Sequence, residues 1–315
     1  MVVTTAAGTT VKSLFASNVA LQPVLMFSLS MVWGLVNGLQ IVAYLMLLNV
    51  PMTANVLVVD EVFYEIATFD LIPLDWINDY LDKTFGDLDN NGEVYLSATA
   101  IDAGFDKTNP IHNLVLPLFF SSITLVFLGL LLLISLFFTS LIKCSRIPLR
   151  VYRTVKKKIF WNYYIRLFIE EYIVISMACM IKLFALDISN YFERFSSIFT
   201  VLLLIVVLGF PVFVWRFLYK RHEQEVLFDS TFNERWGSLT LDLALRYKSP
   251  LLFQVVFMGR RWLLAFIIVA LPRWNWAQIQ LILFSNSLMM IYAGWVQPYK
   301  LPSQNKKELI NEVFI

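Results

Sequence analysis

The stretch from Leu114 to Ile142 reads LVLPLFFSSITLVFLGLLLLISLFFTSLI and contains no charged residue. The next stretch, Lys143–Lys158, reads KCSRIPLRVYRTVKKK and holds seven bases and no acid. A helix that crosses a bilayer needs about 20 mostly apolar residues, and Lys and Arg gather at the cytoplasmic ends of such helices. The first stretch therefore predicts a membrane-spanning helix, and the second predicts that this helix ends in the cytoplasm.

The whole chain has the composition of a membrane protein. Its residues are 58% hydrophobic and 15% charged, whereas about a quarter of the residues of a soluble domain are charged. The hydrocarbon offers the backbone no water, so each span should be a helix. We therefore expect an all-α, polytopic bundle of six spans in an integral membrane protein of the plasma membrane. Besides Leu114–Ile142, the predicted spans are Val24–Val50, Tyr163–Leu186, Ile198–Tyr219, Leu251–Leu271 and Ala277–Val296.

Charge also predicts the topology. Between Pro51 and Asn109 there are twelve acids and only two lysines, so this loop should lie outside and both termini should be cytoplasmic. With this orientation, sixteen of the 25 Lys and Arg residues lie inside and four lie outside. The expected organisation is a cytoplasmic N-terminal segment (1–22), span 1 (23–50), an acidic outer loop (51–110), span 2 (111–142), a basic inner loop (143–162), spans 3 and 4 (163–219), an inner loop (220–249), spans 5 and 6 (250–297) and a cytoplasmic tail (298–315).

The acidic outer loop contains two recognisable patterns. Residues Ala54–Ile77 mix apolar and acidic side chains, which predicts an amphipathic helix at the membrane surface or against the bundle. Asp87, Asp89 and Asn91, followed by a glycine, match the first half of a calcium-binding loop. Ala98 stands where that loop needs a bidentate acid, so a simple Asn-Gly turn is the alternative interpretation.

Four charged residues lie within predicted spans. Glu170 and Glu171 are in the inner half of span 3, and Arg260 and Arg261 are near the middle of span 5. A charge in the hydrocarbon costs about 2.5–3.5 kcal/mol on insertion scales, so such residues usually form pairs or line a wet cavity. Helix rise places the two pairs at a common depth. We expect spans 3 and 5 to touch, with a carboxylate oxygen within about 4 Å of a guanidinium nitrogen. The alternative is that all four reach toward the inner surface without contact.

The basic inner loop predicts a lipid contact. Arg146, Arg150, Arg153 and Lys157 recur at helical spacing, so a helix would present them as one cationic stripe. Clusters of this kind bind anionic head groups, and anionic lipids of the inner leaflet are the expected partners. The alternative is that the charges only set the topology.

Span 1 carries residues suited to helix contacts. Gly34 and Gly38 form a GxxxG pair that would let another helix approach closely, in the same chain or in a homo-oligomer. Asn37 and Gln40 could supply hydrogen bonds between helices.

No pattern indicates catalysis. The sequence lacks motifs for nucleophiles and phosphate-binding loops, so we expect no enzyme and no cofactor, and nothing in it predicts nucleic-acid binding. The two histidines, His112 and His222, fall on opposite sides of the predicted membrane, which excludes a paired-histidine metal site within one chain.

Several junctions resemble a known group of membrane proteins. They are Phe232–Leu243, Pro250–Trp262, Gln297–Lys300 and Asn305–Phe314, together with Pro51–Asn55 and Phe69–Pro73 in the outer loop. These stretches are similar to the multi-pass C-terminal region of ciliate cysteine-rich surface proteins. More distantly, they resemble the fungal transient-receptor-potential-like (flavin-carrier-type) family. The resemblance implies a polytopic membrane protein, in some branches assigned to calcium or cofactor transport. The large cysteine-rich ectodomain of the ciliate proteins is missing, and the relatives usually continue past the position of Ile315.

Two functions follow as hypotheses. The first is a transport or channel-like module of the transient-receptor-potential-like type, in which the charges within spans 3 and 5 form a polar path or a gate. The second is a membrane anchor, scaffold or receptor stem without transport activity, as a fragment of a larger surface protein. The first requires polar residues that converge between helices, and the second does not.

Overall fold

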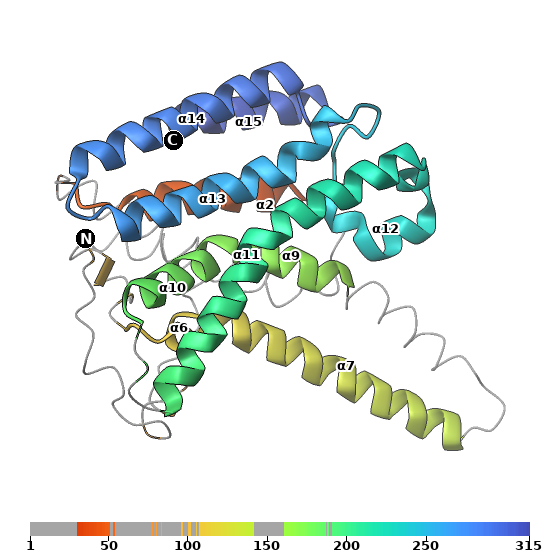
Figure 1. Ribbon diagram of the computed structural model, residues 1–315. Helices are drawn as coiled ribbons and strands as arrows, with labels where there is room; N and C mark the ends of the chain where they lie inside the picture. The colour runs from red at the N-terminus through yellow and green to blue at the C-terminus, as the bar shows by residue number, and fades with distance from the viewer. Residues whose placement is uncertain are drawn as a thin grey trace, which may run out of the picture.

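The computed structural model describes residues 30–50, 107–141, 161–186 and 191–315, and the single positions 53, 77, 80, 83, 96, 100, 101, 105 and 188. All the secondary-structure elements within this part of the chain are helices, as the sequence predicts (Figure 1). They are α2 (Ser30–Leu45), α6 (Pro110–Asn113), α7 (Val115–Leu141), α9 (Asn162–Glu170), α10 (Tyr172–Phe184), α11 (Tyr191–Glu223), α12 (Ser230–Trp236), α13 (Phe253–Ala270), α14 (Asn275–Val296), α15 (Pro302–Phe314) and the short 3-10 helices η2 (Val226–Phe228), η3 (Gly237–Leu239) and η4 (Ser249–Leu252).

Four helices are long and apolar enough to cross a membrane, and they correspond to predicted spans 2, 4, 5 and 6. They lie at Pro117–Phe137, Tyr191–Glu223, Ser249–Ala270 and Asn275–Val296. Predicted span 3 is divided at Glu171 into α9 and α10. In predicted span 1 the described helix is α2, with 16 residues. The chain is thus a helical protein with several membrane-compatible helices, while six spans and cytoplasmic termini stay predictions.

The surface of the bundle is apolar where a bilayer would surround it. Helix α7 exposes Leu133 and Phe137, and α11 exposes Ile205 among many other large apolar side chains. Soluble monomers rarely expose contiguous apolar surface of this extent, which marks contact with a membrane or a partner. In Figure 1, α7 extends away from the other helices. The exposed faces therefore agree with an integral membrane protein.

Helix α10 occupies the centre of the packed region. It lies against α13 and α11 (Figure 1), and its Ala178 and the Ala265 of α13 are fully buried. Small residues at helix contacts let backbones approach closely in membranes. The Tyr172 hydroxyl donates a hydrogen bond of 2.7 Å to the carbonyl of Val207 in α11. Because this hydrogen bond is buried, it holds α10 and α11 in a fixed position relative to each other.

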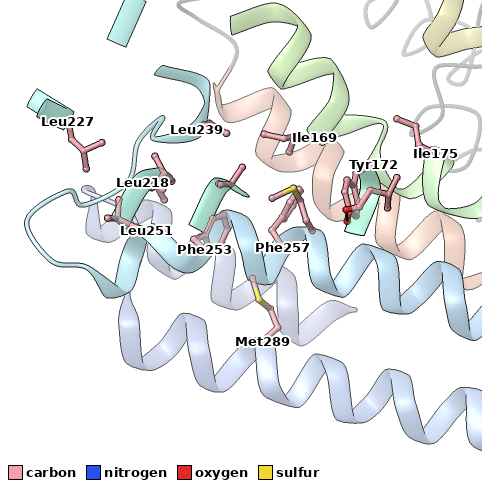
Figure 2. Close-up of a cluster of buried hydrophobic side chains, with 14 of the residues drawn as sticks. Ile169, Tyr172, Ile175, Leu218, Leu227, Leu239, Leu251, Phe253, Phe257 and Met289 are labelled. Atoms are coloured by element: carbon pink, nitrogen blue, oxygen red, sulfur yellow. Dashed lines mark hydrogen bonds between the residues drawn. The ribbon is translucent and has the colours of Figure 1, made fainter. Parts of the chain in front are cut away.

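Residues 224–252, which we call the inner cap, fold over one end of the bundle. The cluster in Figure 2 continues from α9 and α10 into this cap through Leu227, Leu239 and Leu251. The Asn162 side chain at the start of α9 accepts a hydrogen bond from the Ser238 amide at 3.1 Å. An isolated bridge joins Leu243 to Tyr299. The predicted inner loop is therefore a packed part of the fold that fixes the ends of α9, α13 and α14.

Candidate functional site

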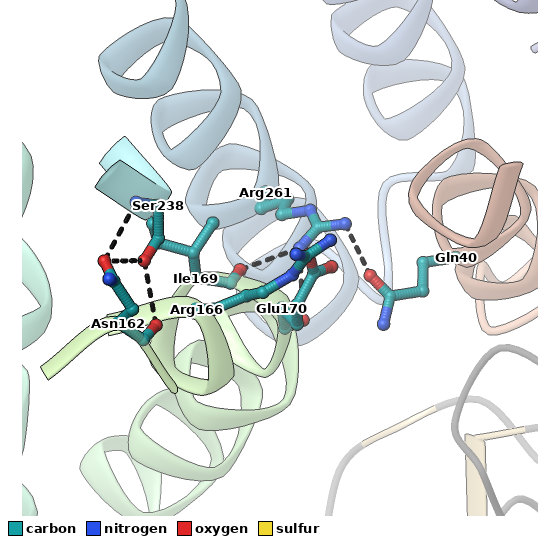
Figure 3. Close-up of polar contacts among 7 residues, drawn as sticks. All are labelled: Gln40, Asn162, Arg166, Ile169, Glu170, Ser238 and Arg261. Atoms are coloured by element: carbon teal, nitrogen blue, oxygen red, sulfur yellow. Dashed lines mark hydrogen bonds and ion pairs between the residues drawn. The ribbon is translucent and has the colours of Figure 1, made fainter. Parts of the chain in front are cut away.

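Arg261 is the centre of a polar cluster among the helices. Its side chain is 0% exposed. One guanidinium nitrogen donates to the carbonyls of Ile169 and Glu170 at 2.9 and 3.1 Å, and the other terminal nitrogen donates to Oε1 of Gln40 (Figure 3). The guanidinium also lies 4.0 Å from the centroid of the Phe257 ring. Arginine's fixed fork of donors suits such a site, because it contacts two helices simultaneously.

The carbonyls that receive Arg261 lie at the end of α9. The last carbonyls of a helix have no partner within it and form the negative end of its dipole. The chain passes through the buried Glu171 and starts α10 at Tyr172. Neither Gly nor Pro stands at this interruption. A buried cation from α13 is therefore the feature that stabilises a discontinuous helix inside the bundle.

Arg260, the preceding residue, forms the second buried contact. One of its guanidinium nitrogens lies 2.6 Å from both carboxylate oxygens of Glu312, and the other donates to Oδ1 of Asn286 at 2.6 Å. The Arg260 and Glu312 side chains are 7% and 4% exposed. Because Glu312 lies in α15 and Asn286 in α14, the two arginines together connect α13 to four other elements.

A polar cavity of about 110 Å³ lies beside these arginines. It has room for water, since one water needs about 10–15 Å³ in such a site. Its charged lining comprises four acids and two arginines, contributed by α9, the inner cap, α13 and α15: Glu170, Asp242, Glu308, Glu312, Arg166 and Arg260. Arg166 lies 3.9 Å from Glu170, one helical turn away. Within the part of the chain that the structure describes, no group of three or more metal-binding side chains occurs.

The four charged residues predicted from the sequence are all buried, and their two spans are in contact. The hydrogen bonds from Arg261 to Ile169 and Glu170 of span 3 are accepted by backbone carbonyl oxygens. Arg260 pairs with Glu312 of α15, a partner that was not predicted, and the expected ion pair between a carboxylate of span 3 and an arginine of span 5 stays a prediction. The prediction missed Glu312 because the tail looked like a soluble segment. A signal was present, since polar residues recur in the tail at helical spacing.

Lys182 has its own buried partner. Its ammonium forms an ion pair with the Glu193 carboxylate, which joins α10 to the first turn of α11 at the end of the bundle opposite the inner cap. Two buried charges thus neutralise each other across a short connection. This pair lies apart from the polar cavity, whose lining does not include it.

Gly38 lies at a contact between two helices, while the GxxxG packing of Gly34 and Gly38 stays a prediction. A Cβ atom added to Gly38 would lie 3.7 Å from the Asn311 side chain, so the helix that approaches Gly38 is α15. Gly34 lies in α2, but its surroundings are outside what the structure describes. Gln40 supplies the predicted hydrogen bond between helices through Arg261.

Several predicted sites lie outside the described residues. These are the cationic stripe (Arg146, Arg150, Arg153 and Lys157), the half calcium loop (Asp87, Asp89 and Asn91) and, apart from Ile77, the predicted amphipathic helix of the outer loop. They stay predictions.

Comparison of the chain with protein-family models, with curated proteins and with solved structures finds no match. The function must therefore be inferred from the residues and their geometry.

Proposed function

We propose that this protein is a transport or channel-like module in which the polar cavity forms part of a path for a small cation. The observation that carries the proposal is the convergence of four acids and two arginines on one cavity between apolar helices. Each charge in the hydrocarbon costs about 2.5–3.5 kcal/mol when it is isolated. A polar path requires such residues, whereas a plain anchor can join its helices without them.

The excess of acids favours a cation. Glu312 neutralises Arg260, and Glu170 lies near Arg166. Asp242 and Glu308 remain as the two acids in excess on the cavity wall. Clefts lined by one sign of charge concentrate ions of the opposite sign. A volume of about 110 Å³ has room for a proton carried by water or for a small hydrated cation.

The inner cap supports access from one side of the membrane. Ser238, Asp242 and Tyr299 belong to the cap and the segment beside it, and all three line the cavity. The predicted topology makes this side cytoplasmic. Arg260 and Glu312 both line the cavity, and the ion pair between them would act as the constriction or gate.

The alternative is an anchor or scaffold in which the charges only join helices. The observation that favours it is the closed geometry of the arginines, because Arg261 is fully buried and Arg260 is bound by Glu312 and Asn286. A flux measurement distinguishes the two functions.

The test is cation uptake into proteoliposomes that contain the purified protein, compared with protein-free vesicles. Asp242→Asn and Glu308→Gln each remove one excess charge without changing side-chain size. Asn also tolerates the left-handed backbone of residue 242, whose φ is 59°. We expect each variant to slow uptake by about tenfold, which corresponds to about 1.4 kcal/mol.

The matched control is Glu234→Gln, because Glu234 is an exposed acid of α12 away from the cavity. This variant should transport like the wild-type protein. Uptake no faster than in protein-free vesicles would favour the anchor. Equal losses in the control and the cavity variants would remove the cavity from the path.

A further inference from the structure

The helix α15 has its polar side turned inward. Among the side chains of α15 that the structure describes, the five that are buried or half-buried are all polar: Gln304, Asn305, Glu308, Asn311 and Glu312. Their spacing places them on one side of a helix with 3.6 residues per turn. A surface helix of a soluble protein has the opposite arrangement, with apolar residues toward the core.

The apolar residues of α15 whose side chains the structure describes point away from the protein. Leu309, Ile310 and Val313 are exposed, Ile310 to 54% and Val313 to 66%. The neighbouring positions Lys306 and Lys307, nearer the start of the helix, are also exposed. This reversed pattern is stable in lipid, because there the apolar face needs no protein partner and the polar face must find one.

Individual polar contacts hold this face of α15 against the rest of the protein. Glu312 pairs with Arg260, and Asn311 lies beside Gly38. The Asn305 side chain accepts a hydrogen bond from the Tyr299 amide at 2.9 Å and donates one to the Tyr299 carbonyl at 3.0 Å. The orientation of α15 is thereby fixed, so its outward face is a property of the fold.

Helix α14, the candidate span next to α15, also exposes apolar side chains. Helix α15 turns back after α14 and runs beside it, and the chain ends near the middle of α14 in Figure 1. On α14 the exposed apolar residues include Leu288, Ile291 and Trp295. A tryptophan near the end of a span is typical of the membrane interface.

We propose that α15 is embedded in the leaflet on the side of the inner cap and that Leu309, Ile310 and Val313 contact lipid acyl chains. Its 13 residues span about 20 Å, so the helix is long enough to reach from the head groups into the hydrocarbon. Lys306 and Lys307 lie at the shallow end, where their ammonium groups reach the head groups. Lipid and the polar cavity thus lie on opposite faces of one short helix.

The experiment is spin-label accessibility in lipid vesicles. Single cysteines replace Ile310 and Val313 in a Cys144→Ser background, since the other cysteine, Cys179, is fully buried. Collision rates are measured with oxygen, which concentrates in lipid, and with a nickel chelate, which stays in water. Ile291→Cys on α14 serves as the lipid-facing reference, and Glu234→Cys on α12 serves as the water-facing reference.

We expect labels at 310 and 313 to collide at least several-fold more with oxygen than with the chelate, as the label at 291 does. Ratios like that at 234 would overturn the proposal, because α15 would then face water. Low collision rates with both reagents would also overturn it, because a protein surface would then cover the face. The measurement needs no transport activity, so its outcome is independent of the proposed path.

Discussion

The buried pair between Arg260 and Glu312 gives the sharpest prediction for stability. Replacing Glu312 with Gln keeps the shape of the side chain but removes the carboxylate that is hydrogen-bonded to the guanidinium, so the new amide and Asn286 are left as its hydrogen-bond partners. Both side chains of the pair are less than one-tenth exposed. Breaking a buried ion pair by removing one partner costs about 3–5 kcal/mol, because the other charge remains buried. The unfolding equilibrium should shift by roughly a hundredfold to a few thousandfold.

The assay is reversible unfolding in mixed micelles with increasing denaturing detergent, followed by circular dichroism. The double variant Arg260→Gln with Glu312→Gln removes both charges, so most of the lost stability should return. The exposed pair between Lys248 and Glu223 is the matched control. Its nitrogen and oxygen are 3.0 Å apart, but the two side chains are 44% and 52% exposed. There the hydrogen bonds that the Lys248 ammonium donates to the Tyr219 hydroxyl and the Glu223 carboxylate raise the pKa of Lys248. Glu223→Gln should change stability little, because solvent screens the pair. The reasoning is refuted if Glu312→Gln costs no more than Glu223→Gln.

Three further substitutions test other contacts by the same unfolding assay. Arg261→Lys replaces a fork of donors with a single ammonium, so the hydrogen bonds to α9 and to Gln40 cannot all be kept. We expect the free energy of unfolding to fall by about 3 kcal/mol, and an unchanged unfolding midpoint would show that the fork is dispensable. Lys182→Met alone leaves the Glu193 carboxylate buried and should cost about 3–5 kcal/mol, whereas adding Glu193→Gln should recover most of it; additive losses would contradict the pairing. Asn162→Ala removes the side-chain bonds between α9 and the inner cap and should cost about 1–2 kcal/mol, with increased proteolysis of the cap; resistance equal to that of the wild-type protein would count against this role.

The long helices could be predicted because their signal is local. An uncharged run such as Leu114–Ile142 can satisfy its backbone in lipid only as a helix, whatever surrounds it, and α7 covers nearly the same residues. Helices α11, α13 and α14 were predicted from long apolar runs in the same way, although α11 and α13 also carry charged residues. The charges of spans 3 and 5 were also predictable as a cluster, because isolated charges are costly in the membrane.

The interruption at Glu171 could not be predicted from the neighbouring residues. It depends on Arg261, which is 91 residues from Glu170 in the chain and reaches the carbonyls at the end of α9 only in the folded bundle. Sequence periodicity reports the helix on both sides of Glu171 and carries no information about a distant donor.

The position of α15 was missed for a related reason. Its polar composition suggested a tail in water, and that interpretation assumes that polar residues face solvent. In this fold Glu308 and Glu312 face the polar cavity instead. Which face of an amphipathic helix turns toward the protein depends on which face finds a partner there. In α15 the polar face finds Arg260, and Arg260 belongs to another helix.

The central claim is that the cavity is a wet, acidic part of a cation path, and charged-reagent modification of Gln254→Cys tests it most directly. Gln254 lines the cavity from α13 and is half-buried. The cysteine is introduced in the Cys144→Ser background, and cationic and anionic thiosulfonates are added from the side of the inner cap while cation uptake is recorded. We predict that the cationic reagent reacts at least about tenfold faster, as expected for a focused negative potential, and that its reaction blocks uptake. No reaction, equal rates for the two reagents, or full uptake after complete modification would contradict the account.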